Sequence, residues 1–307
     1  MALLVVDIGG SAVKYGVWDK ESLHAKDEFP TPPLRADFFT KMKQILDELG
    51  EKYEIEGLGL SCPGETDEKT GKVAGWSFVP FLAFGEFQQT FSDALDGLPV
   101  TMMNDANCAG LAEMRYGVGR GHENPLFLII GSGIGLAFVR DGEIVVDTQS
   151  EISLLDKLVT TALQLLHGIN VSPVQMGKVV SVKKFQLPDS IEGKDVFELA
   201  KQGDKVAKEQ VDKMYQSLAE IIIYLQTIFK PEFFAIGGGL SKNKDLLENL
   251  QQAITDYLAD ENPLFLMFRK QVLQEDETMA APEVKICEYS NDANLIGAAL
   301  HFYDVQQ

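Results

Sequence analysis

The residues near the N-terminus that are best suited to chemistry are an aspartate, two glycines, a serine and a lysine. Asp7 lies in an apolar segment, which Gly9 and Gly10 break before Ser11 and Lys14. Glycines let backbone N–H groups approach an anion without obstruction, and the hydroxyl and the ammonium lie close by. Asp7 cannot bond phosphate oxygens directly, but it could hold Mg²⁺ through water, because that ion keeps much of its hydration shell. The pattern fits either a phosphate-holding turn or an ordinary tight hairpin with an exposed aspartate.

A second glycine turn lies between strand patterns at residues 126–130 and 136–140. It consists of Gly131, Ser132, Gly133, Ile134 and Gly135. The order strand, glycine turn, strand is thereby repeated about 120 residues after its first occurrence, which indicates an internal duplication. Two such hairpins could face one another across a cleft and clamp successive phosphates of one nucleotide.

A third group of glycines ends the strand pattern at residues 232–236 and precedes a helical pattern at residues 243–258. Gly238 and Gly239 in this group permit close approach of the backbone to a flat or charged ligand such as an adenosine moiety. The alternative is a tight crossover turn.

Polar residues also stand at the ends of two other strand patterns. Pro63 and Gly64 end the pattern at residues 55–62, and Asn104 and Asp105 end a shorter one. Asn and Asp are common helix N-caps, and a helical pattern follows. The alternative is that a carboxylate at the carboxyl end of a strand faces a ligand, because open α/β sheets bind ligands there.

These segments fit a two-domain α/β protein. The chain has 307 residues, which is long enough for two cores. A glycine-rich polar stretch at residues 117–124 marks a natural boundary. We expect an N-terminal domain over residues 1–118 and a C-terminal domain over residues 119–290. The small-residue helix at residues 291–307 is expected to cross back to the first domain.

Composition excludes several classes of partner. The chain has 27 basic and 46 acidic residues, giving a formal net charge of −19, so nucleic acid and anionic membranes are poor partners. No apolar run approaches the roughly 20 residues of a membrane helix, and no signal peptide precedes the first strand, so we expect a cytoplasmic protein. The three cysteines lie far apart without a CxxC pair, which excludes a disulfide framework or a cysteine-rich zinc site.

Six motifs in order carry a resemblance that spans nearly the whole chain. They are DIGGSAVK at residues 7–14, SCPGETDEKTGKV at 61–73, NDANCAGLAE at 104–113, GSGIG at 131–135, IGGGLS at 236–241 and NDANLIGAA at 291–299. In this set the chain resembles the ROK group of bacterial sugar kinases and repressors. The resemblance implies an actin-like ATPase fold, which is a duplicated, ribonuclease H-like α/β fold with two lobes and a central cleft. It also implies ATP- and Mg²⁺-dependent phosphorylation of a sugar hydroxyl.

The resemblance further implies roles for individual residues. In the N-terminal lobe, the first phosphate loop would be formed by Gly9, Gly10, Ser11 and Lys14, with Asp7 near Mg²⁺. In the C-terminal lobe, which would bind ATP and dimerise, Gly131 to Gly135 would form the second phosphate loop, and Gly238 and Gly239 would lie against the adenosine. The sugar would be held by Asn104, Asp105, Glu151 and the turn of Pro63 and Gly64. Asp105 would be the general base, because a sugar hydroxyl is a poor nucleophile near neutral pH.

The chain departs from the family pattern around Glu151. Family members commonly read Gly-Glu-Ile-Gly-His where this chain reads Ser-Glu-Ile-Ser-Leu at residues 150–154. The histidine and the cysteine-rich motif that normally follows would ligate one structural zinc, and both are absent, so we predict no zinc. A zinc-less subset of the family resembles this chain, and it includes kinases of β-glucosides as well as of simple hexoses.

The sequence therefore favours a kinase that phosphorylates a hexose or hexose-containing glycoside at the 6-hydroxyl, with a homodimer as the expected assembly. The alternative is a sugar-binding sensor or regulator with weak or no kinase activity, which the altered Glu151 region motivates. A DNA-binding repressor is disfavoured, because the first strand begins at Leu3, where repressors of the family carry a helix-turn-helix, and because the net charge is −19.

Overall fold

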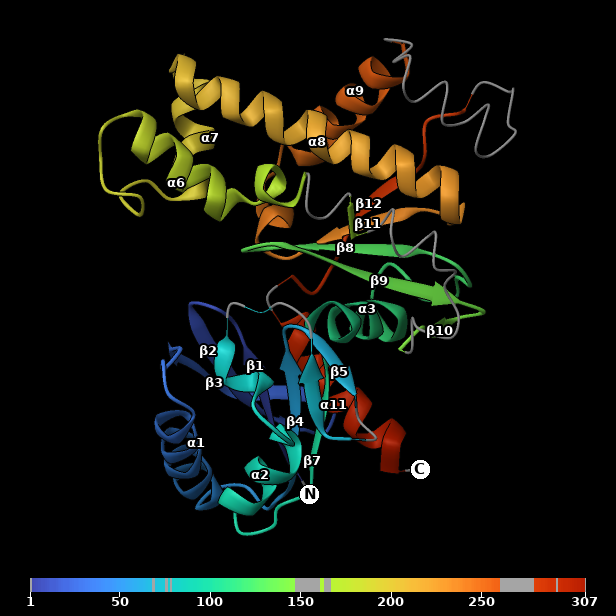
Figure 1. Ribbon diagram of the computed structural model, residues 1–307. Coiled ribbons are helices and arrows are strands. Elements are labelled where there is room, and N and C mark those ends of the chain that lie inside the picture. The colour runs from blue at the N-terminus through green and yellow to red at the C-terminus, as the bar shows by residue number, and fades with distance from the viewer. Residues whose placement is uncertain are drawn as a thin grey trace. The chain divides into compact units, whose positions relative to one another are not determined.

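The computed structural model describes residues 2–67, 70–74, 77, 79–146, 161–162, 167–259, 279–290 and 292–306. The chain divides into two compact units (Figure 1). Unit 1 comprises Met1–Arg120 together with Asn291–Gln307, and unit 2 comprises Gly121–Ser290. Each unit is built on a five-stranded sheet, so each is described separately.

The sheet of unit 1 has the strand order β3-β2-β1-β4-β7. Its strands are β1 (Ala2–Ile8), β2 (Ala12–Asp19), β3 (Ser22–Pro30), β4 (Ile55–Cys62) and β7 (Val100–Asn104). The first three strands pair antiparallel as a meander, whereas β1, β4 and β7 run parallel to one another. Every residue of β1 is buried, as expected for an apolar central strand that is covered on both faces.

The helices of unit 1 are α1 (Arg35–Gly50), α2 (Phe87–Ala94), α3 (Asp105–Tyr116) and α11 (Ala293–Gln306). The short hairpin of β5 (Glu65–Asp67) and β6 (Lys72–Ala74) and the 3₁₀ turn η1 (Pro80–Ala83) join β4 to α2. The predicted return of the C-terminal helix to the first sheet is visible in Figure 1, where the red α11 lies beside α3 and β4.

A cluster of aromatic rings fills the core between α1 and α2. Phe38 of α1 lies 5.5 Å from Phe81 and 5.2 Å from Phe91 between ring centroids. Phe81 belongs to a loop whose aromatic residues suit either a sugar pocket or the core, and its burial identifies it as core. Phe84 of the same loop is exposed.

The sheet of unit 2 has the order β10-β9-β8-β11-β12, which matches that of unit 1 strand for strand. Its strands are β8 (Leu126–Ile130), β9 (Ile134–Arg140), β10 (Glu143–Ile144), β11 (Phe234–Gly237) and β12 (Val284–Ile286). The strands β8, β9 and β10 again form an antiparallel meander, and β8, β11 and β12 run parallel. The duplication that the repeated glycine turns predicted is therefore present in the topology.

The described helices of unit 2 include α6 (Pro173–Lys183), α7 (Gly193–Lys201), α8 (Lys205–Phe229) and α9 (Leu246–Ala259), and a 3₁₀ turn, η2 (Gly239–Lys242), follows β11. The long helix α8 supplies much of the core. It begins at the cap of Asp204, whose side chain accepts a hydrogen bond from Ala207 N at 2.9 Å. It ends where Lys230 takes a left-handed φ of 47° and a proline follows. Within the described residues, the structure contains no helix long and apolar enough to cross a membrane.

Candidate active site

The carboxyl ends of β1, β4 and β7 bring three of the predicted segments to one edge of the unit 1 sheet. Asp7 of β1 pairs in register with Ser61 of β4, and Cys62 pairs with Asn104 of β7. Because the three strands are parallel, the residues that follow each of them emerge on the same side. The first glycine turn, the Pro63-Gly64 turn and the pair Asn104-Asp105 therefore lie at a common edge.

The first glycine turn is tightly closed and leaves backbone donors free. Gly9 N donates to Ala12 O at 3.0 Å, and the Thr31 hydroxyl donates to Gly9 O at 2.6 Å. Gly10 and Ser11 are exposed, and neither of their N–H groups has a hydrogen-bond partner among the described residues. Free N–H groups on a constrained turn suit the binding of an anion such as a phosphate.

Lys14 and Asp7 face each other across the hairpin. They are register partners in the β1–β2 ladder. Lys14 is half-buried, and its ammonium makes no ion pair with any residue that the structure describes. Its positive charge is therefore available to a ligand beside the turn.

Asp7 is buried, with 9% of its surface exposed, so the alternative of a hairpin with an exposed aspartate is wrong. One carboxylate oxygen, Oδ1, accepts hydrogen bonds from Ser61 Oγ at 2.7 Å and from Asn294 Nδ2 at 2.9 Å. The other oxygen, Oδ2, has no hydrogen-bond partner in the described part of the chain. A buried carboxylate that keeps one oxygen free fits a hydrated Mg²⁺.

Asn104 is the N-cap of α3, as the helix-capping interpretation expected. Its side-chain oxygen accepts hydrogen bonds from Ala106 N at 2.9 Å and Asn107 N at 3.2 Å. Its amide nitrogen donates to Gly64 O at 2.9 Å. The capping bonds hold the start of α3, and the third bond ties the Pro63-Gly64 turn to it. Capping uses only the amide oxygen, so it does not by itself exclude a contact between the amide nitrogen and a ligand.

Asp105 is the first residue of α3 and retains some exposed surface. Its Oδ1 accepts a hydrogen bond from Ala106 N at 2.9 Å. Burial of the carboxyl, together with the negative charge of Asp7, raises the pKa of Asp105 to about 6. A carboxyl with this pKa is ionised near neutral pH and is still basic enough to accept a proton efficiently.

Gly64 occupies a conformation that suits glycine. Its φ is +102°, and a Cβ at this position would lie 2.8 Å from Ala74 O. The turn of Pro63 and Gly64 is therefore held from two sides, by the β6 backbone and by the Asn104 amide.

The second glycine turn, in unit 2, repeats the design of the first. Gly131 N donates to Gly133 O at 3.0 Å, and the Ser172 hydroxyl donates to Gly131 O at 2.8 Å, as Thr31 does to Gly9 in unit 1. Gly131 and Gly133 are open, because a Cβ at either would have no neighbour within 4 Å. The turn is shorter than predicted, since Gly135 lies within β9 and pairs with Ile129.

The third glycine group follows β11, the parallel neighbour of β8. Gly238 has a φ of +76°, and a Cβ there would lie 2.9 Å from the carbonyl carbon of Ile130. Gly239 has open space around its Cα. Gly238 thus packs against the end of β8 as a tight crossover turn requires, and Gly239 leaves room for a flat ligand.

The structure does not test two of the predictions, namely the role of Glu151 and the absence of zinc. Glu151, the fourth predicted sugar residue, lies outside the described residues, as does the rest of the altered 150–154 segment. Within the described ranges, no group of three or more His, Cys, Asp or Glu residues is arranged to hold a metal ion. The absence of zinc stays a prediction.

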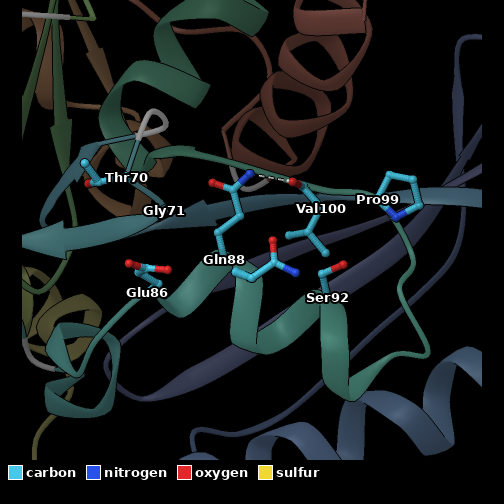
Figure 2. Close-up of a pocket in the computed structure, with 8 residues that line it drawn as sticks. Thr70, Gly71, Glu86, Gln88, Ser92, Pro99 and Val100 are labelled. Atoms are coloured by element: carbon cyan, nitrogen blue, oxygen red, sulfur yellow. Dashed lines mark hydrogen bonds between the residues drawn. The ribbon is translucent and has the colours of Figure 1, made fainter.

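A separate pocket in unit 1 lies away from these residues. Figure 2 shows it lined by Gln88, Ser92 and neighbours at the N-terminal end of β7, where Gln88 Nε2 donates to Val100 O at 2.7 Å. Val100 begins β7 and Asn104 ends it, a separation of about 13 Å along an extended strand. None of the predicted site residues lines this pocket.

Sequence reasoning missed four residues that support the site. Thr31 and Ser172 each anchor a glycine turn, and Ser61 and Asn294 each bind Asp7. A signal existed for Asn294, because its motif NDAN at residues 291–294 repeats NDAN at residues 104–107. No comparable signal marks the two hydroxyl anchors.

Comparison with known proteins agrees with the motif pattern. A family model described as the ROK family matches residues 3–149 and 176–302. The glucokinase of Thermotoga maritima is 25% identical over 331 residues, covering 97% of this chain and 96% of that protein. The β-glucoside kinase of Klebsiella pneumoniae is 26% identical over 317 residues, covering 98% and 96%.

Solved structures show the same relationship at the level of the fold. A ROK family glucokinase from Streptomyces griseus, solved in complex with glucose and AMPPNP, has a TM-score of 0.69 at 23% identity and covers 98% of this chain and 99% of its own. Such neighbours have the actin-like ATPase fold, so the predicted fold class is confirmed.

Proposed function

Because the chain belongs to the ROK family, we propose that it is a kinase that transfers the terminal phosphoryl group of ATP to a sugar hydroxyl. The acceptor is a hexose or a hexose-containing glycoside, and the hydroxyl is the one at position 6. Curated relatives that match over nearly the whole chain are named glucokinase and β-glucoside kinase, which supports this class of acceptor.

The observation that carries the proposal is the environment of Asp105. Its pKa of about 6 and its position at the shared edge of β1, β4 and β7 suit a general base. The Asp105 carboxylate takes the proton of the sugar hydroxyl while the hydroxyl oxygen attacks the terminal phosphorus and the bond to ADP breaks. A base of this kind contributes about 10²–10⁴-fold to the rate.

The remaining unit 1 residues position the two substrates. Asn104 is assigned to the sugar through its side-chain amide, and the Pro63-Gly64 turn, which Asn104 holds, forms the adjoining wall. Glu151 is assigned to the sugar as well. The free N–H groups of Gly10 and Ser11 bind phosphate oxygens, and the Lys14 ammonium neutralises their charge.

The remaining residues are assigned to Mg²⁺ and to the nucleotide. Asp7 would hold Mg²⁺ through water, and the bound ion would neutralise the negative charge on the phosphates. In unit 2, the Gly131–Gly135 segment is assigned to the phosphates, and Gly238 and Gly239 are assigned to the adenosine. The expected homodimer, the cytoplasmic location and the absence of zinc belong to this proposal as predictions.

The test is a coupled assay of ADP release with Mg-ATP across glucose, fructose, mannose, N-acetylmannosamine, cellobiose and gentiobiose. We expect turnover on at least one sugar, and we expect Asp105→Asn to fold normally but to lose about 10²–10⁴-fold in kcat. The matched control is Asp37→Asn, which removes an exposed carboxylate in the first turn of α1.

Two results would contradict the proposal. Near wild-type kcat in Asp105→Asn would remove Asp105 from the role of base. Silence across the panel, with sugar binding still detectable by calorimetry, would favour the alternative function of a sugar-binding sensor.

A further inference from the structure

We propose that Asn294 is a positioning residue for Asp7, so that the C-terminal helix completes the metal and phosphate side of the site. This inference rests on the proposed function, because it assigns Asp7 to hydrated Mg²⁺. The motif that contains Asn294 has no role in the mechanism described so far. Its side chain nevertheless reaches a residue 287 positions earlier in the sequence.

The contact is specific in its atoms. Asn294 Nδ2 and Ser61 Oγ both donate to Asp7 Oδ1, at 2.9 Å and 2.7 Å. Two donors on one oxygen restrict the rotation of the carboxylate. The free Oδ2 is then held in one direction, which is what a water-mediated metal contact requires.

The packing of α11 on β4 explains why Asn294 lies next to Asp7. A Cβ on Gly59 of β4 would lie 2.5 Å from Ala298 O, so the glycine admits the helix backbone at this point. A Cβ on Gly57 would overlap the ring of Phe302. Gly57, Gly59 and Ser61 are alternate residues on one face of β4. The two glycines lie against Phe302 and Ala298, and Ser61 shares Asp7 Oδ1 with Asn294, which precedes Ala298 by one helix turn.

The two spacings match. Two residues of strand advance about 6.6 Å, and four residues of helix advance about 6 Å. Every second residue of β4 therefore lies at the same height as every fourth residue of α11 over three positions. The helix runs antiparallel to the strand. On the neighbouring side, a Cβ on Gly297 would overlap the backbone of Cys108 in α3, so α11 is also fixed laterally. Asn294 is consequently held by packing and does not depend on its own hydrogen bond for its place.

A purely structural role for Asn294 is the competing explanation, and the variants are chosen to separate the two. Asn294→Leu keeps the approximate size but cannot donate a hydrogen bond. Asn294→Asp keeps the shape but places a second negative charge against Asp7. The matched control is Asp304→Asn, which breaks the contact of Asp304 with Arg115 at 3.2 Å near the other end of the same helix.

The first readout does not need turnover. Calorimetry measures the binding of AMPPNP with Mg²⁺ and with EDTA. We expect Asn294→Leu to weaken Mg²⁺-dependent binding about tenfold to a hundredfold and Asn294→Asp to weaken it more. We expect binding of AMPPNP in EDTA, and the affinity for sugar by calorimetry, to stay near wild type. Asp304→Asn is expected to match wild type in all of these.

A double-mutant cycle completes the test. In an Asp7→Asn background, Asn294→Leu is expected to add little, because its target has already changed. Ser61→Ala supplies a second, independent removal of a donor if Asn294→Leu fails to fold. Equal Mg²⁺-dependent binding in wild type, Asn294→Leu and Asn294→Asp would overturn the inference. A wild type that binds Mg-AMPPNP but phosphorylates no sugar would instead contradict the proposed function.

Discussion

At the scale of single residues, the pKa of Asp105 determines when the proposed base can work. Burial and the charge of Asp7 raise this pKa to about 6, so the carboxyl is protonated below that pH. We expect kcat/KM to rise with pH through about 6 and to level off above it, because only the ionised form accepts a proton. Steady-state rates at subsaturating sugar and Mg-ATP from pH 4.5 to 8 check this. A flat profile across that range would contradict the role of Asp105.

The raised pKa of Asp105 can also be tested without an activity assay, through the pH dependence of the free energy of unfolding. Its pKa is raised in the folded protein, so between about pH 4 and pH 6 the folded state binds more protons than the unfolded state. The contribution of Asp105 to the free energy of unfolding is therefore present below about pH 4 and is lost as pH rises through about 6. Denaturant titrations of Asp105→Asn should lack this component of the pH dependence, whereas Asp37→Asn should retain it.

The residues of the site were predictable where a local pattern sets their neighbours. Asp7, Gly9 and Lys14 share one hairpin, so the alternation of the strands and the position of the turn placed them together correctly. Asn294 was not placed by any such rule, because its partner lies 287 residues away and depends on how a helix packs. Gly135 was assigned to the wrong element, because glycine is compatible with both a turn and a strand end.

At the scale of elements, the glycines of β4 set the distance between sheet and C-terminal helix. Gly59→Ala would place a Cβ 2.5 Å from Ala298 O, and the backbone of α11 would have to move. We expect this variant to lose about 1–3 kcal/mol in the free energy of unfolding. Urea denaturation followed by circular dichroism measures the loss.

Gly50→Ala is the matched control for that substitution. Gly50 ends α1, and a Cβ there would have no neighbour within 4 Å. We expect a neutral or slightly stabilising effect, because alanine has the higher helix propensity. Equal stability changes for the two substitutions would show that α11 does not pack against β4 as described.

Element prediction from the sequence was accurate where one apolar period dominates. The helical pattern predicted after Asn104 and Asp105 is α3, which already includes Asp105, and the strand predicted at residues 126–130 is β8. The stretch at residues 183–201 is polar and mixed, which gives no clear structural prediction, and α7 occupies its end. There, a capping box between Glu192 and Asp195 holds the start of the helix, and Val196, Phe197 and Leu199 pack into the core.

At the scale of the whole molecule, unit 1 is assembled from both ends of the chain. Residues of α11 such as Leu295, Ala298 and Phe302 are buried in it. We expect deletion of residues 293–307 to expose the core of unit 1 and to abolish activity, because the apolar face of the sheet loses its cover. Hydrogen exchange should rise throughout β1, β4 and β7, while unit 2 keeps its protection.

Deletion of residues 305–307 alone is the control for this truncation. Val305 and Gln306 are exposed, so their removal uncovers no core. Wild-type protection of β4 after the longer deletion would contradict the assignment of α11 to unit 1. The duplicated strand order was foreseeable from the repeated glycine turns, whereas the contribution of the last helix to the first site required its packing partners to be known.

The position of α11 also orders events during synthesis. Unit 2 is contiguous in sequence, whereas the first 120 residues must wait for α11, which is translated after all of unit 2. At about 5–20 residues per second, that delay lasts roughly 10–40 s. During this time the sheet of unit 1 lacks its final helix, and Asp7 lacks Asn294. A ribosome that stops before α11 is made therefore releases a chain in which Asp7 lacks Asn294, so the proposed phosphate site is completed only once that helix has been translated.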